Sequence, residues 1–187
     1  MPYPSQVTGT TIIETATALI ERDGVESLSL ARIATTLGIR APSLYRYFDS
    51  KSALLQAVNL RTTQDLIAAL IEAAASSSQT HADRIMALAH AYRAFAHAHP
   101  RAYALAYSMT DPAAQPDPAA LAALAQQVQA VVAPITGEAT SLAALRGLWA
   151  LVHGFVILEL AGQFQRGGDL TSAYTSAVEA YVRGLSE

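Results

Sequence analysis

The chain has 187 residues, of which 52% are hydrophobic and 14% charged, with a formal net charge of −3 at pH 7. This length suits one domain or two small ones and is ample for a hydrophobic core. The lack of cysteine excludes disulfides and thiolate metal sites. The most apolar stretch, residues 147–162, contains His153 and Glu159 and is too short and too polar to span a membrane. No signal peptide is evident, so we expect a soluble, cytoplasmic protein.

Apolar residues at helical spacing, separated by capping residues, predict an all-α protein of about nine helices, three in an N-terminal head and six in a C-terminal body. No alternating strand pattern and no internal repeat is present. We place the domain boundary between residues 1–52 and 53–187. The expected helices cover residues 8–23, 29–37, 42–48, 51–75, 80–99, 100–109, 117–132, 140–165 and 169–185.

Residues 29–51 stand out as two short helices joined by a tight turn, with a third helix starting at Lys51. The first helix has one apolar face, and Leu44 and Phe48 turn the second helix inward. Although the whole chain is net negative, this stretch has four basic residues and a single acidic one. A short basic helix that exposes Arg, Ser and Tyr fits the DNA major groove. The alternative is an ordinary helical hairpin with surface arginines.

The string LARIATTLGIRAPSLYRYFDSK resembles the DNA-binding signature of the tetracycline-repressor (TetR) family. It has the order apolar–Ala–x–x–Leu–Gly–apolar, then Leu–Tyr–x–aromatic–Phe, then Lys. The resemblance implies a bacterial transcriptional regulator that binds double-stranded operator DNA as a homodimer and is not an enzyme. The second helix of the pair, residues 42–48, is the recognition helix in this comparison.

The family resemblance also implies roles for individual residues. Tyr45 and Tyr47 correspond to aromatic residues that touch phosphate or sugar. Lys51 corresponds to a lysine that holds a phosphate at a helix N-terminus. The residues that correspond to base contacts are Arg40, Ala41, Pro42, Ser43 and Arg46.

Two positions depart from the family pattern. Ala31 stands where some members read a base with arginine, which leaves open whether Arg32 compensates. Residues 9–11, Gly-Thr-Thr, replace the basic residues that many members have at the start of the first helix. We therefore expect any phosphate contact there to come from hydroxyls or backbone N–H groups.

In the body, Trp149 and His153 are i, i+4 neighbours on one helix face, followed by Gly154. This segment resembles the W-x-x-x-H-G segment of one subgroup of TetR-family C-terminal domains. A large aromatic beside one polar group fits the wall of a mostly apolar ligand pocket, although plain core packing is equally compatible. The two charged residues in 87–109, Arg93 and Arg101, can both point outward. The remaining candidates for the pocket lining are Tyr92, Phe95, Tyr103, Tyr107 and Met109.

Metal, cofactor and catalytic sites are not predicted. His90 and His97 lie seven residues apart on one helix face, but no carboxylate stands at ligand spacing with them. We expect a solvated helix face there. The sequence also has no nucleophile elbow, no phosphate-binding glycine loop and no paired catalytic carboxylates.

These features predict a ligand-responsive repressor that a small, mostly apolar effector releases from a palindromic operator. One alternative is a DNA-binding dimer without an effector, and the other is an all-helical carrier of lipids or small molecules with a vestigial head. We expect the last two helices to form a two-fold four-helix interface. Its small residues would be Gly147, Ala150, Gly154, Ala161, Ala173, Ala177, Ala180 and Gly184, and its apolar area would come from Leu158, Leu160, Tyr174, Val178 and Tyr181.

Overall fold

The structure is a computed structural model of the chain that describes residues 7–77, 80–107 and 111–185. Over these residues it contains eight α-helices and three short 3-10 helices, without any strand. The predicted all-α fold is therefore confirmed. The nine expected helices correspond to the eight α-helices together with one 3-10 helix, η2, at Ala41–Arg46.

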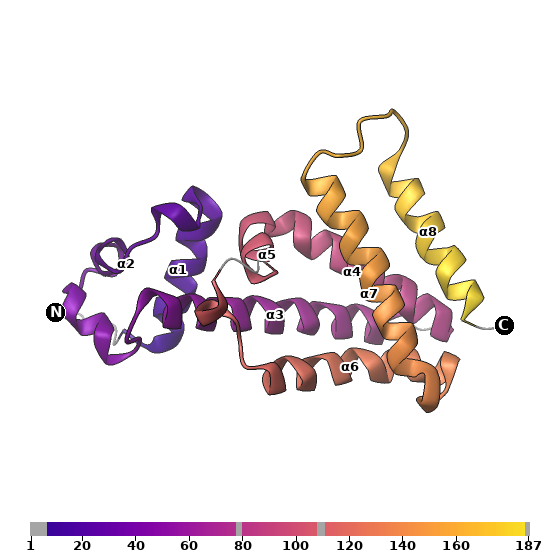
Figure 1. Cartoon of the computed structure of the whole chain (residues 1–187), viewed down its shortest axis with the longest axis horizontal. Helices are drawn as coiled ribbons and strands as arrows, with labels where there is room; N and C mark the ends of the chain where they lie inside the picture. The colour runs from indigo at the N-terminus through magenta and orange to yellow at the C-terminus, as the bar shows by residue number, and fades with distance from the viewer. Residues whose placement is uncertain (1–6, 78–79, 108–110, 186–187) are drawn as a thin grey trace. The chain divides into compact units, whose positions relative to one another are not determined.

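The helices belong to two compact units, each built from two separate segments of the sequence. Unit 1 comprises Met1–Thr63 and His99–Pro118, and unit 2 comprises Gln64–Ala98 and Ala119–Glu187. The long helix α3, Lys51–Ser76, starts in unit 1 and ends in unit 2 (Figure 1). The domain boundary that we place after residue 52 rests on sequence pattern and stays a prediction.

Unit 1 holds the predicted head. Ser29 caps its second helix, as expected, because the Ser29 hydroxyl accepts the Arg32 backbone N–H at 3.2 Å. Gly24 ends the first helix with a φ of 82°, a conformation that glycine adopts without steric cost. The expected recognition helix is a 3-10 helix. The elements of this unit are α1 (Gly9–Asp23), η1 (Val25–Ser27), α2 (Leu30–Thr36), η2, the start of α3, α5 (Pro100–Ala106) and η3 (Pro112–Ala114).

The core of unit 1 is aliphatic and joins the predicted head helices. The apolar face predicted for residues 29–37 lies against this core, and so does the inward-facing Phe48. Burial of these side chains fixes the two short helices against α1, because neither helix is long enough to be stable alone. The residues with 0% exposure here are Ile12, Ala16, Ile20, Ile33, Leu44, Leu54 and Val58.

In unit 2, the helices α4, α7 and α8 pack against one another. Asp169 caps α8 by accepting the backbone N–H groups of Thr171 and Ser172. Helix α7 ends at Leu160, earlier than the end that we predicted at residue 165. The α-helices that lie largely or wholly in this unit are α4 (His81–Ala98), α6 (Pro118–Thr136), α7 (Glu138–Leu160) and α8 (Leu170–Gly184).

Helix α6 continues through Pro134 to Thr136, although we expected Pro134 to help end it near Val132. Proline keeps a helix-compatible φ but has no N–H to donate to the carbonyl four residues earlier, so the helix continues past it with one backbone hydrogen bond fewer. The helix stops only at Gly137, where φ is 76°. Glycine is the residue that adopts this backbone conformation most readily.

Two residues that we assigned to the dimer interface are instead buried within this chain. Tyr174 and Val178, which we expected to supply apolar area to a second subunit, are fully buried inside unit 2. They lie on the face of α8 that packs against its own chain, which periodicity alone does not distinguish from an interface. A close approach occurs at Gly147, where an added Cβ would clash with the Tyr181 hydroxyl oxygen. Around Gly154, by contrast, an added Cβ would meet no atom within 4 Å.

Two helices, α6 and α7, are long and apolar enough to cross a membrane by length and composition alone. Their most apolar windows have mean hydropathies of 1.4 and 1.7. Core helices of soluble proteins meet the same criterion, and α7 packs against both α4 and α8. These two helices are therefore weak grounds for placing the chain in a membrane.

Candidate nucleic-acid interface and effector region

The candidate nucleic-acid interface is centred on η2, which presents polar and aromatic side chains around one apolar anchor. Leu44 is fully buried, whereas the neighbouring Tyr45 and Tyr47 are 55% and 47% exposed. Arg46 is also exposed, at the end of the segment. The buried leucine fixes the segment to the core and leaves the flanking residues to face solvent.

The residues before Leu44 divide between packing and exposure. Arg40, at the N-cap of η2, and Pro42, in its first turn, are exposed. Ala41 and Ser43 are half-buried, and Ala41 packs against the core of unit 1. Among the predicted base contacts, Arg40, Pro42 and Arg46 are thus the most accessible.

Two further candidates, Tyr47 and Lys51, follow η2 in the chain and contact residues near α1. The Tyr47 hydroxyl donates to the Val7 carbonyl at 2.7 Å, which ties the segment before α1 to the recognition segment. Lys51 begins α3, and its Nζ donates to the Val25 carbonyl at 3.3 Å. Ser50 caps this helix by accepting the Ala53 N–H at 3.0 Å. An exposed cation at a helix N-terminus is well placed to meet a phosphate.

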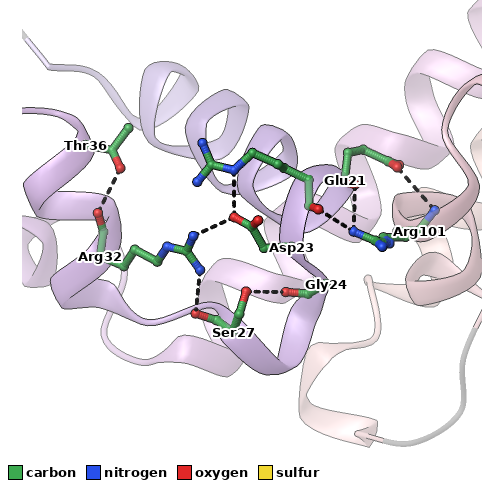
Figure 2. Close-up of polar contacts among 8 residues, drawn as sticks. Glu21, Asp23, Gly24, Ser27, Arg32, Thr36 and Arg101 are labelled. Carbon is green, nitrogen blue, oxygen red and sulfur yellow. Dashed lines mark hydrogen bonds and ion pairs between the residues drawn. The ribbon is translucent and has the colours of Figure 1, made fainter.

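Arg32 is engaged within the head. Its Nη2 lies 2.5 Å from Oδ2 of Asp23, and its Nη1 donates to the Ser27 carbonyl at 3.4 Å (Figure 2). The same Asp23 oxygen also accepts from Nε of Arg22 at 2.7 Å. The hydrogen bond from Arg22, followed by the charges of both arginines, lowers the pKa of Asp23. Arg32 therefore joins α2 to the end of α1, a role that the sequence left open.

Three of the predicted effector residues, all in unit 2, meet in one cluster. The Tyr92 hydroxyl lies 3.0 Å from Nδ1 of His153, and the Tyr92 and Trp149 rings pack edge to face with centroids 5.5 Å apart. Tyr92 is fully buried, while Trp149 and His153 are half-buried. Burial lowers the pKa of His153, so its ring is neutral at pH 7 and offers one donor and one acceptor nitrogen. The cluster thus combines two aromatic rings with one hydrogen-bonding imidazole.

The remaining described candidates for the effector region lie in both units. Phe95 is half-buried on α4 in unit 2. Tyr103 and Tyr107 belong to unit 1, where their rings pack with centroids 4.9 Å apart. Met109 lies outside the described residues.

A second polar cluster joins α4 to α7, and the sequence did not reveal it. Arg93, for which the sequence allowed an outward position, binds Glu159 through Nε at 2.9 Å and Nη2 at 2.6 Å. His97 lies 3.0 Å from the same carboxylate, whose side chain is only 8% exposed. Hydrogen bonds from Arg93 and then His97 lower the pKa of Glu159 to about 2. Sequence reasoning missed this pair because 66 positions separate Arg93 and Glu159.

The outer face of α4 forms a shallow groove of about 240 Å³, lined by His90, Arg93, Ala94 and His97. Both histidines are exposed, and the His90 ring packs edge to face on Tyr174 at 5.9 Å. Within the part of the chain that the structure describes, no group of three His, Cys, Asp or Glu residues is arranged to hold a metal ion.

Comparison with known protein families assigns both halves of the chain. Residues 12–58 match the model of bacterial regulatory proteins of the tetR family, and residues 85–181 match the tetracyclin repressor-like C-terminal domain. The chain belongs to the TetR family. The narrower resemblance around Trp149 and His153 to the W-x-x-x-H-G subgroup stays a prediction.

Relatives of this TetR-family chain cover almost its whole length. An uncharacterized HTH-type transcriptional regulator of Mycobacterium tuberculosis is 35% identical over an alignment of 187 positions, which covers 97% of this chain and 83% of that protein. A protein of unknown function from Rhodococcus sp. RHA1 has a structure with a TM-score of 0.82, 26% identity and complete coverage of both chains. A TetR variant from Acinetobacter baumannii AYE, solved in complex with minocycline, shares the fold with a TM-score of 0.70, 18% identity and 96% coverage of both chains.

Membership of the TetR family establishes the general activity. TetR-family regulators are non-enzymatic proteins that bind operator DNA and small-molecule effectors as dimers, and this chain is a DNA-binding transcriptional regulator. The predicted helix-turn-helix head is thereby confirmed. The individual DNA contacts, the effector residues and the subunit interface stay predictions.

Proposed function

We propose that this TetR-family regulator contacts DNA through η2 and the start of α3. The observation that carries this proposal is the arrangement around Leu44, whose burial fixes the segment while Tyr45, Arg46 and Tyr47 stay exposed. Arg46 reads a base edge in the major groove, and Lys51 holds a phosphate. The further contacts in this proposal are Arg40, Ala41, Pro42 and Ser43 around the bases, and Tyr45 and Tyr47 on the backbone.

The proposed regulator is a homodimer that pairs through α7 and α8. Helix α7 leaves Leu142, Ile157 and Leu158 exposed, which a second copy would cover. On α8, Ala173, Ala180 and Gly184 are also exposed, and such small residues permit close helix approach. Two heads related by a two-fold axis then match a palindromic operator whose half-sites are about 34–36 Å apart.

The proposed effector is a small, mostly apolar molecule that binds beside Trp149 and His153. Trp149 and His153 are half-buried next to the buried Tyr92, so one polar position stands beside aromatic surface. An effector that binds more tightly to the form with the wrong head spacing lowers operator affinity, which makes the protein a repressor. We place this activity in the cytoplasm, where the operator DNA is.

The test starts with selection of bound duplexes from a random DNA pool, followed by a screen of uncharged compounds for release. Trp149 is the single tryptophan of the chain, so its fluorescence reports directly on a ligand bound beside it. We expect a palindromic duplex to be selected and the active compounds to change the fluorescence. Failure to enrich any duplex would contradict the DNA-binding assignment, and release without a fluorescence change would place the effector elsewhere.

A substitution tests the base contact specifically. Arg46→Ala removes the exposed arginine at the end of η2, and we expect a loss of about 1–3 kcal/mol in discrimination at one operator position. A base change at that operator position should weaken binding of Arg46→Ala little further, because the variant no longer contacts this base. Equal weakening on all sequences would instead identify Arg46 as a backbone contact.

A further inference from the structure

The last three residues of α1 form a junction that holds two different helices. Glu21 and Arg22 contact α5, whereas Asp23 contacts Arg32 of α2 (Figure 2). All of these residues belong to unit 1, although 80 positions separate Glu21 from Arg101. A junction of this kind links the helix-turn-helix to a segment that lies far outside it in the sequence.

The contact with α5 is a reciprocal pair of helix caps. Nη1 of Arg101 donates to the Glu21 carbonyl at 3.1 Å and to the Arg22 carbonyl at 2.5 Å. These carbonyls belong to the last turn of α1, which has no intrahelical partners for them. A cation at this end also interacts favourably with the helix dipole. Arg101 therefore caps the C-terminus of α1.

Glu21 caps α5 in return. Its carboxylate accepts the backbone N–H groups of Arg101 at 3.3 Å and Ala102 at 2.7 Å. The first residue of α5 is Pro100, which has no N–H, and the side chain of the N-cap residue His99 makes no cap hydrogen bond. The carboxylate of α1 thus does for α5 what an N-cap side chain normally does.

The junction continues into the helix-turn-helix through the next residue of α1. Asp23 holds the guanidinium of Arg32, and Arg32 follows closely on the N-cap Ser29 of α2. A displacement of α5 that pulls on the end of α1 therefore also acts on α2. Since α2 packs against η2, the orientation of the exposed η2 side chains depends on this junction.

We propose that Glu21 and Arg101 are positioning residues for operator binding, which keep α5 docked on the end of α1 and thereby set the orientation of η2. This inference rests on the proposed DNA interface and assigns to the α1–α5 junction a role in affinity. Neither residue contacts DNA in this proposal. Loss of either cap lets α5 separate from α1 and weakens binding.

Charge alone predicts opposite effects for the two residues, which provides a sharp test. Removing the negative charge in Glu21→Gln would strengthen attraction to DNA, whereas removing the positive charge in Arg101→Ala would weaken it. If both residues act by positioning, both variants bind more weakly, by about fivefold, as expected for the loss of one helix cap. Their effects should be less than additive in the double variant, because either substitution opens the same junction.

The experiment measures binding of the full-length protein to a duplex that the wild type has selected from a random pool, at several salt concentrations. Two charge-matched controls, Glu14→Gln on the exposed face of α1 and Arg166→Ala in the loop before α8, should bind within about twofold of the wild type. The salt slope should stay unchanged in Glu21→Gln and Arg101→Ala, because neither removes a phosphate contact. Arg101→Lys, which keeps a cation at the end of α1, should restore most of the affinity.

The outcomes separate this inference from the proposed function. If the wild type selects no duplex, the proposed DNA interface fails. If it selects one and Glu21→Gln binds as tightly as Glu14→Gln, the positioning role is wrong. A salt slope reduced by about one in Arg101→Ala would make Arg101 a phosphate contact and would also overturn it. If circular dichroism shows that Arg101→Ala does not fold, the DNA affinities of Glu21→Gln and Arg101→Lys test the positioning role.

Discussion

The candidate functional residues of the two units differ in where their side chains lie. In unit 1, the DNA-contact candidates project from η2 into solvent and depend on one buried leucine for support. In unit 2, Tyr92 is fully buried, and Trp149 and His153 are half-buried inside helix packing. Substitutions at the first site should therefore change binding at constant stability, whereas those at the second should change both together.

The largest expected effect tests this contrast within η2 itself. Leu44→Ala removes a fully buried side chain, and we expect the free energy of unfolding to fall by about 2–5 kcal/mol. Tyr45→Ala, next to it and 55% exposed, should change stability by no more than about 0.5 kcal/mol while weakening DNA binding. Denaturant titration and DNA binding, measured on both variants, give the result. Equal destabilisation would show that η2 has no separate packing and contact faces.

The next effect concerns the Arg93–Glu159–His97 cluster of unit 2 and depends on pH. Because the folded-state pKa of Glu159 is lowered to about 2, its stabilisation is fully present above the ordinary carboxyl pKa and is lost as the pH falls toward 2. Glu159→Gln should lower the free energy of unfolding by about 1.5–3 kcal/mol at neutral pH. The exposed Glu179→Gln is the matched control. A difference from wild type that stays constant down to pH 3 would contradict the ionic account.

A smaller effect separates two glycines of α7. Gly147→Ala places a Cβ against the Tyr181 hydroxyl, which already donates to the Ala144 carbonyl at 2.8 Å, and we expect a cost of about 1–3 kcal/mol. Gly154→Ala meets no atom of its own chain and should gain up to about 1 kcal/mol from helix propensity. Melting curves measure both. If Gly154 lies in the proposed dimer interface, its variant should also shift sedimentation toward monomer.

The features that the sequence predicted correctly are those that depend on residues close together in the chain. The helix starts near residues 29 and 169 and the apolar face of residues 29–37 depend on contacts within one or two helical turns, and the structure confirms them. The family signature also identifies η2 as the recognition segment, because the signature is one uninterrupted stretch of sequence. The 3-10 geometry of that segment was not predicted, because a run of six residues has no periodicity long enough to distinguish 3-10 from α-helix.

The contacts that sequence reasoning missed join residues far apart in the chain. The sequence indicated no partner for Arg93 or Arg101, whereas in the structure Arg93 binds a carboxylate of α7 and Arg101 caps α1. Tyr174 read as an interface residue, but its hydroxyl donates to the Ala89 carbonyl at 2.6 Å inside unit 2. Periodicity shows which face of a helix is apolar or charged, and tertiary packing decides what that face meets.

The smallest expected effect is at Lys51 and sharpens the surface side of the comparison. Its Nζ makes one exposed hydrogen bond to the Val25 carbonyl, so Lys51→Ala should change stability by at most about 0.5 kcal/mol. A phosphate contact contributes equally on every sequence and releases a bound counterion. We therefore expect weaker binding to all duplexes alike and a salt slope reduced by about one. Arg183→Ala, an exposed charge near the end of α8, serves as the control and should leave the slope unchanged. A wild-type slope in Lys51→Ala would remove Lys51 from the interface, while a loss confined to one operator position would make it a base reader.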